Sequence, residues 1–122
     1  MSSVLRVIPL QNALVITIYD LTRLYYGDFH IVKLEITCPV SIHRELFDLD
    51  ADFTDACRLL GDKVVYRRTV EQLGVPSTEI ERVQQKLIDT FSDNSLRYFS
   101  SPDFPAKLVK AELKKFRKRL MK

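Results

Sequence analysis

The hydrophobic pattern of this chain changes its period once, near residues 74–76. Before that point β-branched and aromatic residues dominate, and in residues 32–38 apolar side chains alternate with Lys, Glu and Thr. After it, apolar residues recur every three or four positions. Alternation is typical of a strand with one face on a core, and the longer period is typical of an amphipathic helix. The pattern therefore predicts an α+β fold in which most strands precede the long helices.

Strand-forming residues are concentrated in the first 70 positions. The expected strands are 4–8, 13–21, 29–42 and 63–70. Turn signals at 9–12 and at Gly27-Asp28 separate the first three, which predicts a meander within a largely antiparallel, four-stranded sheet. Pro39 lacks a backbone donor, so the third strand either ends there or runs along an edge. The last strand has no clean apolar face, which also indicates an edge.

Three helices are expected. A short helix near 52–60 follows an acidic segment and ends at Gly61. The clearest helix spans 77–92, where Thr78 and Glu81 have capping-box spacing and Asn94 favours a stop near residue 93. Its apolar stripe consists of Ile80, Val83, Leu87 and Phe91. We expect this stripe, together with a C-terminal helix at 104–121, to cover the apolar face of the sheet.

The length of 122 residues fits one domain with its own core, so we expect a single α+β domain over 1–122. No segment approaches the roughly 20 apolar residues that cross a bilayer. The N-terminal segment lacks the cleavage pattern of a signal peptide, and two cysteines are too few for a disulfide framework. We therefore expect a cytoplasmic protein with no membrane partner.

Positive charge is concentrated at the C-terminal end. Residues 103–122 contain eight Lys or Arg and two acids, a local balance of +6 in a chain whose formal net charge is +3. The first 102 residues therefore sum to −3. On the expected helix 104–121, cations surround a narrow apolar stripe, so one face is expected to dock and the rest to face solvent. Such a surface attracts anionic partners, although lysine-rich helix faces are also common without any ligand.

Nucleic acid or another polyanion is one ligand class for this surface, because Lys and Arg release counterions when they neutralise phosphates. The candidate residues are Lys107, Lys110, Lys114, Lys115, Lys118 and Arg119 of the helix, extended by Arg67 and Arg68 of the last strand. Residues 23–26 and 66–68 interleave aromatics with cations, as base-stacking sites do. Tyrosine is equally an ordinary strand residue, so packing also explains these patterns.

Motifs for catalysis and metal binding are not found in the sequence. There is no Gly-x-Ser-x-Gly elbow, and three scattered glycines cannot form a phosphate-binding loop. The acidic run 48–52 resembles the start of a calcium loop, but Phe53 and Leu59 stand where that loop needs Gly and Glu. The two His and two Cys have no zinc-site spacing. We expect no metal, no cofactor and no enzymatic activity.

Three stretches resemble a family of small, uncharacterised bacterial proteins that is defined only as a domain of unknown function. They are Ile18-Tyr19-Asp20-Leu21 with Gly27-Asp28, Asn94-Ser95-Leu96, and Ser101-Pro102-Asp103-Phe104-Pro105. The resemblance implies no activity, cofactor or site. The same residues also suit turns between strands, a helix stop and a helix start.

The sequence thus favours a non-catalytic protein-interaction domain that binds another protein, or a second copy of itself, through an exposed sheet edge or the C-terminal helix. The alternative is binding of nucleic acid or another polyanion by the basic helix, for which affinity should fall steeply with salt. A third hypothesis is a small hydrolase or transferase whose groups meet only in the folded chain.

Overall fold

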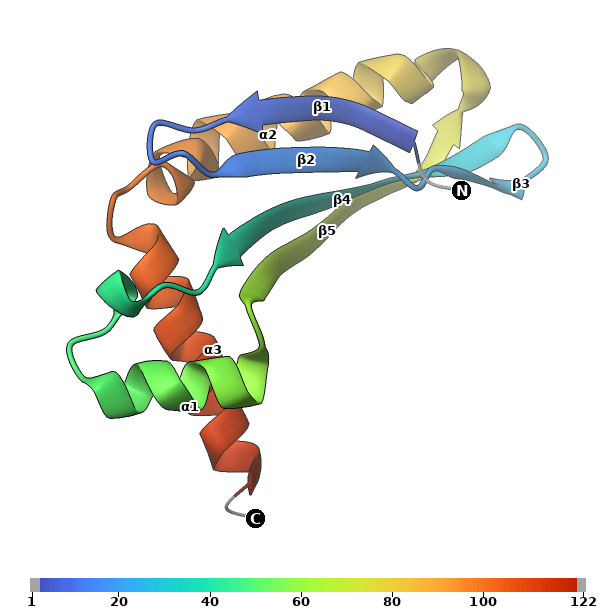
Figure 1. Ribbon diagram of the computed structural model, residues 1–122. Helices are drawn as coiled ribbons and strands as arrows, with labels where there is room; N and C mark the ends of the chain where they lie inside the picture. Colours follow the sequence, from blue (N-terminus) through green and yellow to red (C-terminus); the bar gives the residue numbers. More distant parts are fainter. Residues whose placement is uncertain (1–2, 121–122) are drawn as a thin grey trace.

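The computed structural model describes residues 3–120 and contains one antiparallel sheet and three α-helices (Figure 1). The strands are β1 (Ser3–Pro9), β2 (Val15–Asp20), β3 (Arg23–Tyr26), β4 (Phe29–Ser41) and β5 (Lys63–Pro76). The α-helices are α1 (Asp50–Leu60), α2 (Ile80–Phe99) and α3 (Phe104–Leu120), and single 3-10 turns at Arg44–Leu46 and Ser77–Glu79 precede α1 and α2. The predicted α+β class and antiparallel sheet are confirmed.

Strand β4 is the centre of the sheet. β5 pairs along one side of it, β2 and β3 share the other side, and β1 pairs with β2. β2 and β3 are two halves of one interrupted strand, since Asp20 faces Leu34 and Arg23 faces Ile31 in the same register. The Asp20 side chain accepts a hydrogen bond from the Thr22 N–H at 2.8 Å, and this turn takes the chain out of the ladder. The meander is therefore present, but with a fifth, short strand that the sequence did not predict.

Strand β5 is an edge strand, as its mixed pattern predicted. Within residues 3–120 it pairs only with β4, and it continues beyond the expected end at residue 70. The extension includes a bulge, because Leu73 and Gly74 together lie opposite Ile31. Gly74 has a φ of +67°, a conformation that favours glycine.

Pro39 lies inside β4. It pairs with Val65 on β5, whereas the pairing between β2 and β4 reaches only as far as Thr37. Among the described residues, no neighbouring strand therefore needs a backbone donor from Pro39 on its free side. Of the two alternatives that the sequence left open, the edge position is confirmed.

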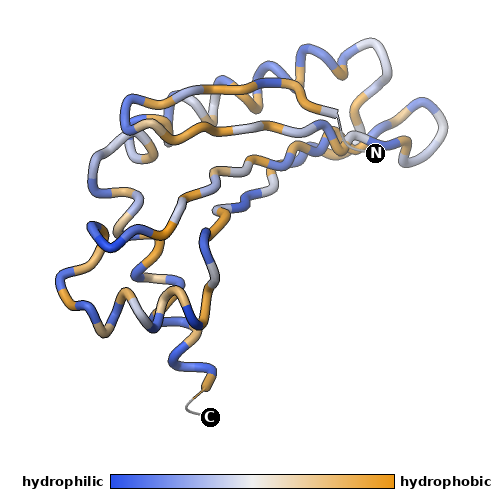
Figure 2. Tube along the Cα trace, in the orientation of Figure 1, coloured by the Kyte–Doolittle hydropathy of each residue, from blue (hydrophilic) through white to orange (hydrophobic). Residues whose placement is uncertain are grey.

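Helix α2 packs its apolar stripe against β4, as predicted. Val83 lies in a buried cluster with Val32, and Phe91 lies in the larger core with Leu34 and Ile36. The even-numbered residues of β4 face this helix, and orange and blue alternate along β4 and β5 in Figure 2. Full burial of one such aliphatic side chain contributes about 1.5–3 kcal/mol to the free energy of folding. This face of β4 is therefore a main source of the stability of the fold.

Both ends of α2 differ from the prediction. The capping box is wrong, because Thr78 belongs to a 3-10 turn and α2 has no side-chain hydrogen bond at its N-terminal cap. The expected stop near Asn94 is also wrong, since α2 continues to Phe99. Leu96 and Phe99 extend the apolar stripe into the core, and this burial outweighs the local tendency of Asn94 to end a helix.

A cluster of aromatic rings fixes the corner between α2 and α3. The Phe99 ring lies 4.8 Å from the ring of Phe104 and 4.9 Å from that of Tyr66, centroid to centroid. Asn12, in the turn between β1 and β2, donates from Nδ2 to the carbonyl oxygens of Phe99 at 2.7 Å and Ser101 at 3.0 Å. The first donation satisfies a carbonyl in the last turn of α2, where the helix itself supplies no donor, and the Ser101 carbonyl also accepts from the Phe104 N–H at 3.2 Å. The corner is thereby attached to the sheet.

Most of α3 lies beyond the sheet and packs against α1 (Figure 1). Its first residue, Phe104, contacts Tyr66 of β5, while Val109 and Leu113 are buried in the part of the core that includes Ala56 of α1. The expectation that the C-terminal helix covers the sheet therefore holds only for its first turn. Among residues 3–120, no helix combines the length and the apolar composition that a membrane crossing requires.

Candidate functional site

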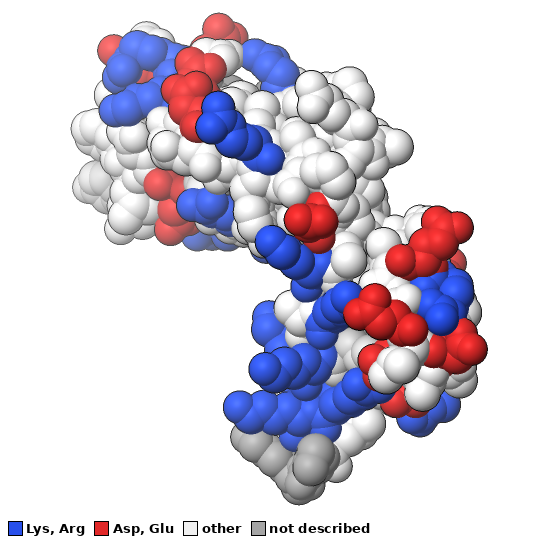
Figure 3. All heavy atoms as spheres, turned by 90° about the vertical axis from the view of Figure 1, so that its left-hand side faces the viewer, with Lys and Arg blue, Asp and Glu red and all other residues white. Residues whose placement is uncertain are grey.

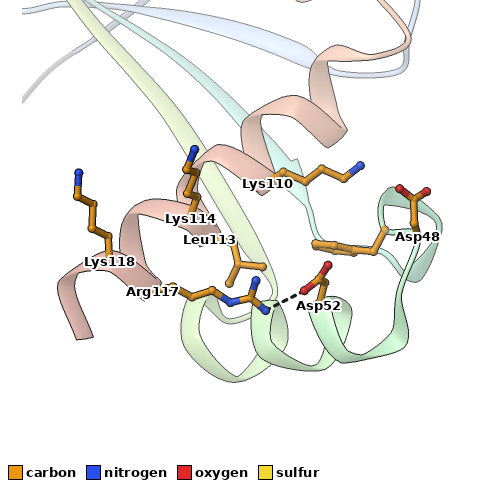
Figure 4. Close-up of a pocket in the computed structure, with 8 residues that line it drawn as sticks. Asp48, Asp52, Lys110, Leu113, Lys114, Arg117 and Lys118 are labelled. Atoms are coloured by element: carbon orange, nitrogen blue, oxygen red, sulfur yellow. Dashed lines mark hydrogen bonds and ion pairs between the residues drawn. The ribbon is translucent and has the colours of Figure 1, made fainter. Parts of the chain in front are cut away.

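A groove of about 610 Å³ lies between α1 and α3, and we call it the α1–α3 groove (Figure 4). Its lining comprises Phe47, Asp48, Asp52, Lys110, Leu113, Lys114, Arg117 and Lys118. Cationic residues come from α3, and both carboxylates come from the segment that leads into α1 and from its first turn. The groove thus has a basic rim, an acidic rim and an apolar part.

The apolar part is formed by Phe47 and Leu113, which are both buried. Phe47 directly follows the 3-10 turn before α1, and its ring lies 6.0 Å from that of Phe53. Leu113 belongs to the apolar stripe of α3. Because the two residues also belong to the main core, the positions of the two rims follow from the packing of α3 on α1.

Arg117 joins the two helices across the groove. Its Nη2 donates to Asp52 Oδ1 at 2.9 Å and to Asp55 Oδ2 at 2.6 Å. The hydrogen bond from Arg117, with a second one from Arg58, holds the pKa of Asp55 below its usual range. The same two carboxylates raise the pKa of Arg117. All three paired side chains are more than a third exposed, so the pairs orient the rims more than they stabilise the fold.

Lys110, Lys114 and Lys118 form a row along the basic rim. Their spacing of four residues places each about 6 Å from the next along the helix axis. Among residues 3–120 none of the three makes an ion pair, whereas Lys115 lies 3.3 Å from Glu112. Figure 3 shows blue side chains gathered on one flank of the lower part of the molecule, with red ones on the other flank. The row therefore presents positive charge that no carboxylate in this part of the chain neutralises.

The structure brings together only some of the cations that the sequence proposed for polyanion binding. Lys110, Lys114 and Lys118 line the groove, while Lys107 and Arg119 are exposed elsewhere on α3. Lys115 is paired with an acid on its own helix, as described above.

Arg67 and Arg68 of β5 point to opposite faces of the sheet, because side chains alternate along a strand. Tyr66 contacts Phe104 of α3, so Arg68 shares the helix-covered face and Arg67 lies on the other face, 3.3 Å from Glu35. The two arginines therefore cannot both extend the surface of α3.

Sequence reasoning missed three of the groove residues that matter most. Phe47 was not singled out, Asp52 was interpreted as part of an acidic flank of α1, and Arg117 was counted only as one cation of a basic helix. Asp52 and Arg117 are 65 residues apart, so no local spacing connects them. One available signal was that Arg117 lies four residues after Leu113, next to the apolar stripe.

Metal ligands and thiols are the other groups that could form a site. No cluster of three or more His, Cys, Asp or Glu side chains among residues 3–120 is arranged to hold a metal ion. Cys38 is buried and Cys57 is exposed, and both are free thiols. Burial raises the pKa of the Cys38 thiol to about 11.

Comparison of this chain with models of protein families, with curated proteins and with solved structures gave no match. The scattered motifs that resemble an uncharacterised bacterial family therefore receive no support from a family model.

Proposed function

We propose that this chain is a non-catalytic interaction domain that binds an acidic, amphipathic helical segment of another protein in the α1–α3 groove. The observation that carries the proposal is the row of Lys110, Lys114 and Lys118 beside an apolar wall, with no ion pair to these lysines among the described residues. A helix with acids four residues apart has the same axial repeat as the row. Its apolar side chains would pack on the alkyl stems of the three lysines and on the small exposed parts of Phe47 and Leu113, which are 5% and 3% exposed.

The acidic rim distinguishes this ligand from a nucleic acid. Asp48 and Asp52 stand opposite the lysine row, and Arg117 already neutralises part of the charge of Asp52. A densely charged phosphate backbone in the groove would be repelled by Asp48. An acidic helix can avoid this contact, because a basic or polar side chain on its other flank meets Asp48 instead.

Binding of nucleic acid or another polyanion remains the second candidate. The observation in its favour is that Lys107 and Arg119 add exposed cations on α3 outside the groove, more than a single acidic helix requires. A ligand that follows the outer surface of α3 would use these residues as well as the row, and it would not need the apolar wall. The two candidates therefore differ in the residues on which they depend.

The test is a fluorescence anisotropy titration with a synthetic peptide helix that carries Glu every four residues and Leu on the adjacent stripe. A scrambled peptide of the same composition and a single-stranded oligonucleotide are titrated alongside. We expect the amphipathic peptide to bind best. The variant K110Q/K114Q/K118Q should lose between about threefold and about a hundredfold in affinity, because each of the three exposed charge pairs contributes about 0.2–1 kcal/mol.

The matched control is K63Q/K86Q/R97Q, which removes the same charge from exposed positions outside α3. It should bind the peptide as the unmodified protein does. Equal binding of the scrambled peptide would contradict a groove that reads an amphipathic helix. Tighter binding of the oligonucleotide, lost equally on substitution of Lys107 and Arg119, would establish the polyanion candidate instead.

We further propose that the protein works in the cytoplasm. Support comes from Cys57, a free thiol exposed on α1, because reducing compartments keep such thiols unpaired. Cys38 gives no such support, because it is buried in the core and its thiol is not open to solvent oxidants. Mass spectrometry of the protein isolated from its own cells under alkylating conditions would test this, and a mixed disulfide on Cys57 would contradict it.

A further inference from the structure

The free edge of β5 is the longest strand edge without a neighbouring strand in the described part of the molecule. β5 has 14 residues, and within residues 3–120 it pairs only with β4. From Lys63 to Gln72 its register against β4 is unbroken, so this stretch is regular up to the bulge at Leu73 and Gly74. In Figure 1 no helix or strand lies along the outer side of the middle of β5. A regular unpaired edge of this kind is a template for another strand.

Symmetry restricts how two copies of β5 can pair. Two identical edges that form one continuous antiparallel sheet are related by a twofold axis perpendicular to the sheet, which leaves each side chain on its own face. Directly opposite residues must lie on the same face. A residue can therefore pair only with itself or with one that is an even number of positions away. This leaves a small set of possible registers, each centred on one residue.

Charge selects one of these registers. Centres at Arg67, Arg68 or Glu71 place a like charge directly opposite itself, which destabilises a strand pair. A centre at Thr69 instead places Arg67 opposite Glu71 of the second copy, and by symmetry it does so twice. Further outward, Val65 approaches Leu73 of the second copy at the point where the bulge begins, and Leu73 is 61% exposed in the single chain.

The neighbouring strand continues the same alternation of charge. On the face that α2 does not cover, Lys33 of β4 lies opposite Glu71, and Glu35 lies 3.3 Å from Arg67. In the Thr69-centred register, Glu71 would lie between Lys33 of its own chain and Arg67 of the second copy. Arg67 would lie between Glu35 and Glu71 of the second copy. Glu71 and Arg67 would thus each have an oppositely charged neighbour on both sides.

We infer that this chain forms a twofold-symmetric dimer in which the β5 edges pair antiparallel about Thr69 and join the two sheets into one. The contact between the two copies consists of the free backbone edge of β5 and of side chains on the sheet face that α2 does not cover. It does not involve the α1–α3 groove, so it is independent of the proposed peptide binding. The second copy is the occupant because the charges of β5 complement those of β5 itself.

The experiment is sedimentation equilibrium of the full chain with charge-reversal variants. Arg67→Glu gives each chain two acids at the paired positions, and Glu71→Arg gives each chain two arginines there. Each single variant should weaken the dimer by roughly tenfold or more, because two attractive cross-strand pairs become repulsive. The double variant R67E/E71R restores opposite charges between the two copies and should dimerise more strongly than either single variant, but less strongly than the wild type, because the exchanged charges then meet the like charges of Glu35 and Lys33 within each chain.

An equimolar mixture of the two single variants gives the sharpest result. R67E and E71R should associate with each other as a heterodimer, since every paired position then carries opposite charges. Thermal melting of each variant confirms that it is folded. A wild-type chain that stays monomeric at the highest attainable concentration would overturn the inference. So would single variants that dimerise as strongly as the wild type, or a mixture that associates no better than its components.

Discussion

Arg117 is the residue that links α3 to α1 by charge. Its guanidinium contacts two carboxylates that are three positions apart on α1, so one side chain spans almost a full helical turn. The arrangement depends on packing that is already present, because Leu113 and Ala56 bring the two helices together. The interaction therefore sets the relative orientation of the rims of the α1–α3 groove.

The effect of these pairs on stability should depend on pH. The pKa of Asp55 is lowered in the folded protein, so its contribution is present above the ordinary value of about 3.9 and is lost as the pH falls through the lowered value. We expect Asp55→Asn to be less stable than the wild type at neutral pH, with the difference closing in acid. Urea denaturation at several pH values measures this. Asp93→Asn is the control for removal of an exposed carboxylate, and a difference that stays constant into strong acid would contradict the prediction.

Among the elements, the corner between α2 and α3 has the densest aromatic packing. The Phe99 ring lies within 6 Å of four other rings, those of Phe91, Tyr98, Tyr66 and Phe104. They come from two helices and an edge strand, so the cluster joins three elements at one corner. The extension of α2 to Phe99 is what places this ring at the centre.

Truncation of Phe99 should therefore be costly. We expect Phe99→Ala to lower the free energy of unfolding by about 3–5 kcal/mol, through lost burial and a residual cavity. Chemical denaturation followed by circular dichroism provides the measurement. Leu120→Ala is a matched truncation at an exposed position in the last turn of α3, and its effect should stay within about 0.5 kcal/mol. If the two variants were equally stable, the corner would not have the structural role assigned to it.

At the scale of the whole molecule, buried side chains are distributed unevenly. Strands β2 and β4 contribute most of the fully buried residues, while α1 contributes only Ala56 and α3 contributes none after Leu113. The core is continuous between the sheet and these helices, but it becomes thin at the end that contains the groove. The lower end of the molecule in Figure 1, formed by α1 and the later turns of α3, thus contributes few of the buried side chains.

Local opening should follow this distribution. We expect backbone amides of α1 and of the last two turns of α3 to exchange with solvent at a lower opening free energy than those of β4. Native-state hydrogen exchange resolved by residue is the measurement, and amides of α2 near Phe91 act as an internal reference for the core. Uniform protection across α1 and β4 would mean that the molecule opens only as a unit. Binding of the amphipathic peptide should raise protection in α1 and α3 selectively.

Local periodicity was sufficient to predict the antiparallel sheet, the edge character of β5 and the positions of the three helices. These features depend on alternation and on turn residues within a few positions, which the chain displays directly. The boundaries of α2 were not predictable in this way. The cap signal at Thr78 and the stop signal at Asn94 are weak local preferences, and the burial of Phe99 outweighed the second of them.

The order of residues was enough to predict that a basic amphipathic helix follows an antiparallel sheet, because charged and apolar residues alternate with recognisable periods. Where that helix packs, and which of its cations have no ion pair within residues 3–120, depends on the folded arrangement of the whole chain. Arg117 meets Asp52 and Asp55 across more than 60 residues of sequence, while the lysine row is left facing a groove. Such contacts depend on which faces meet in the folded core, and that choice is made by long-range packing that no local pattern encodes.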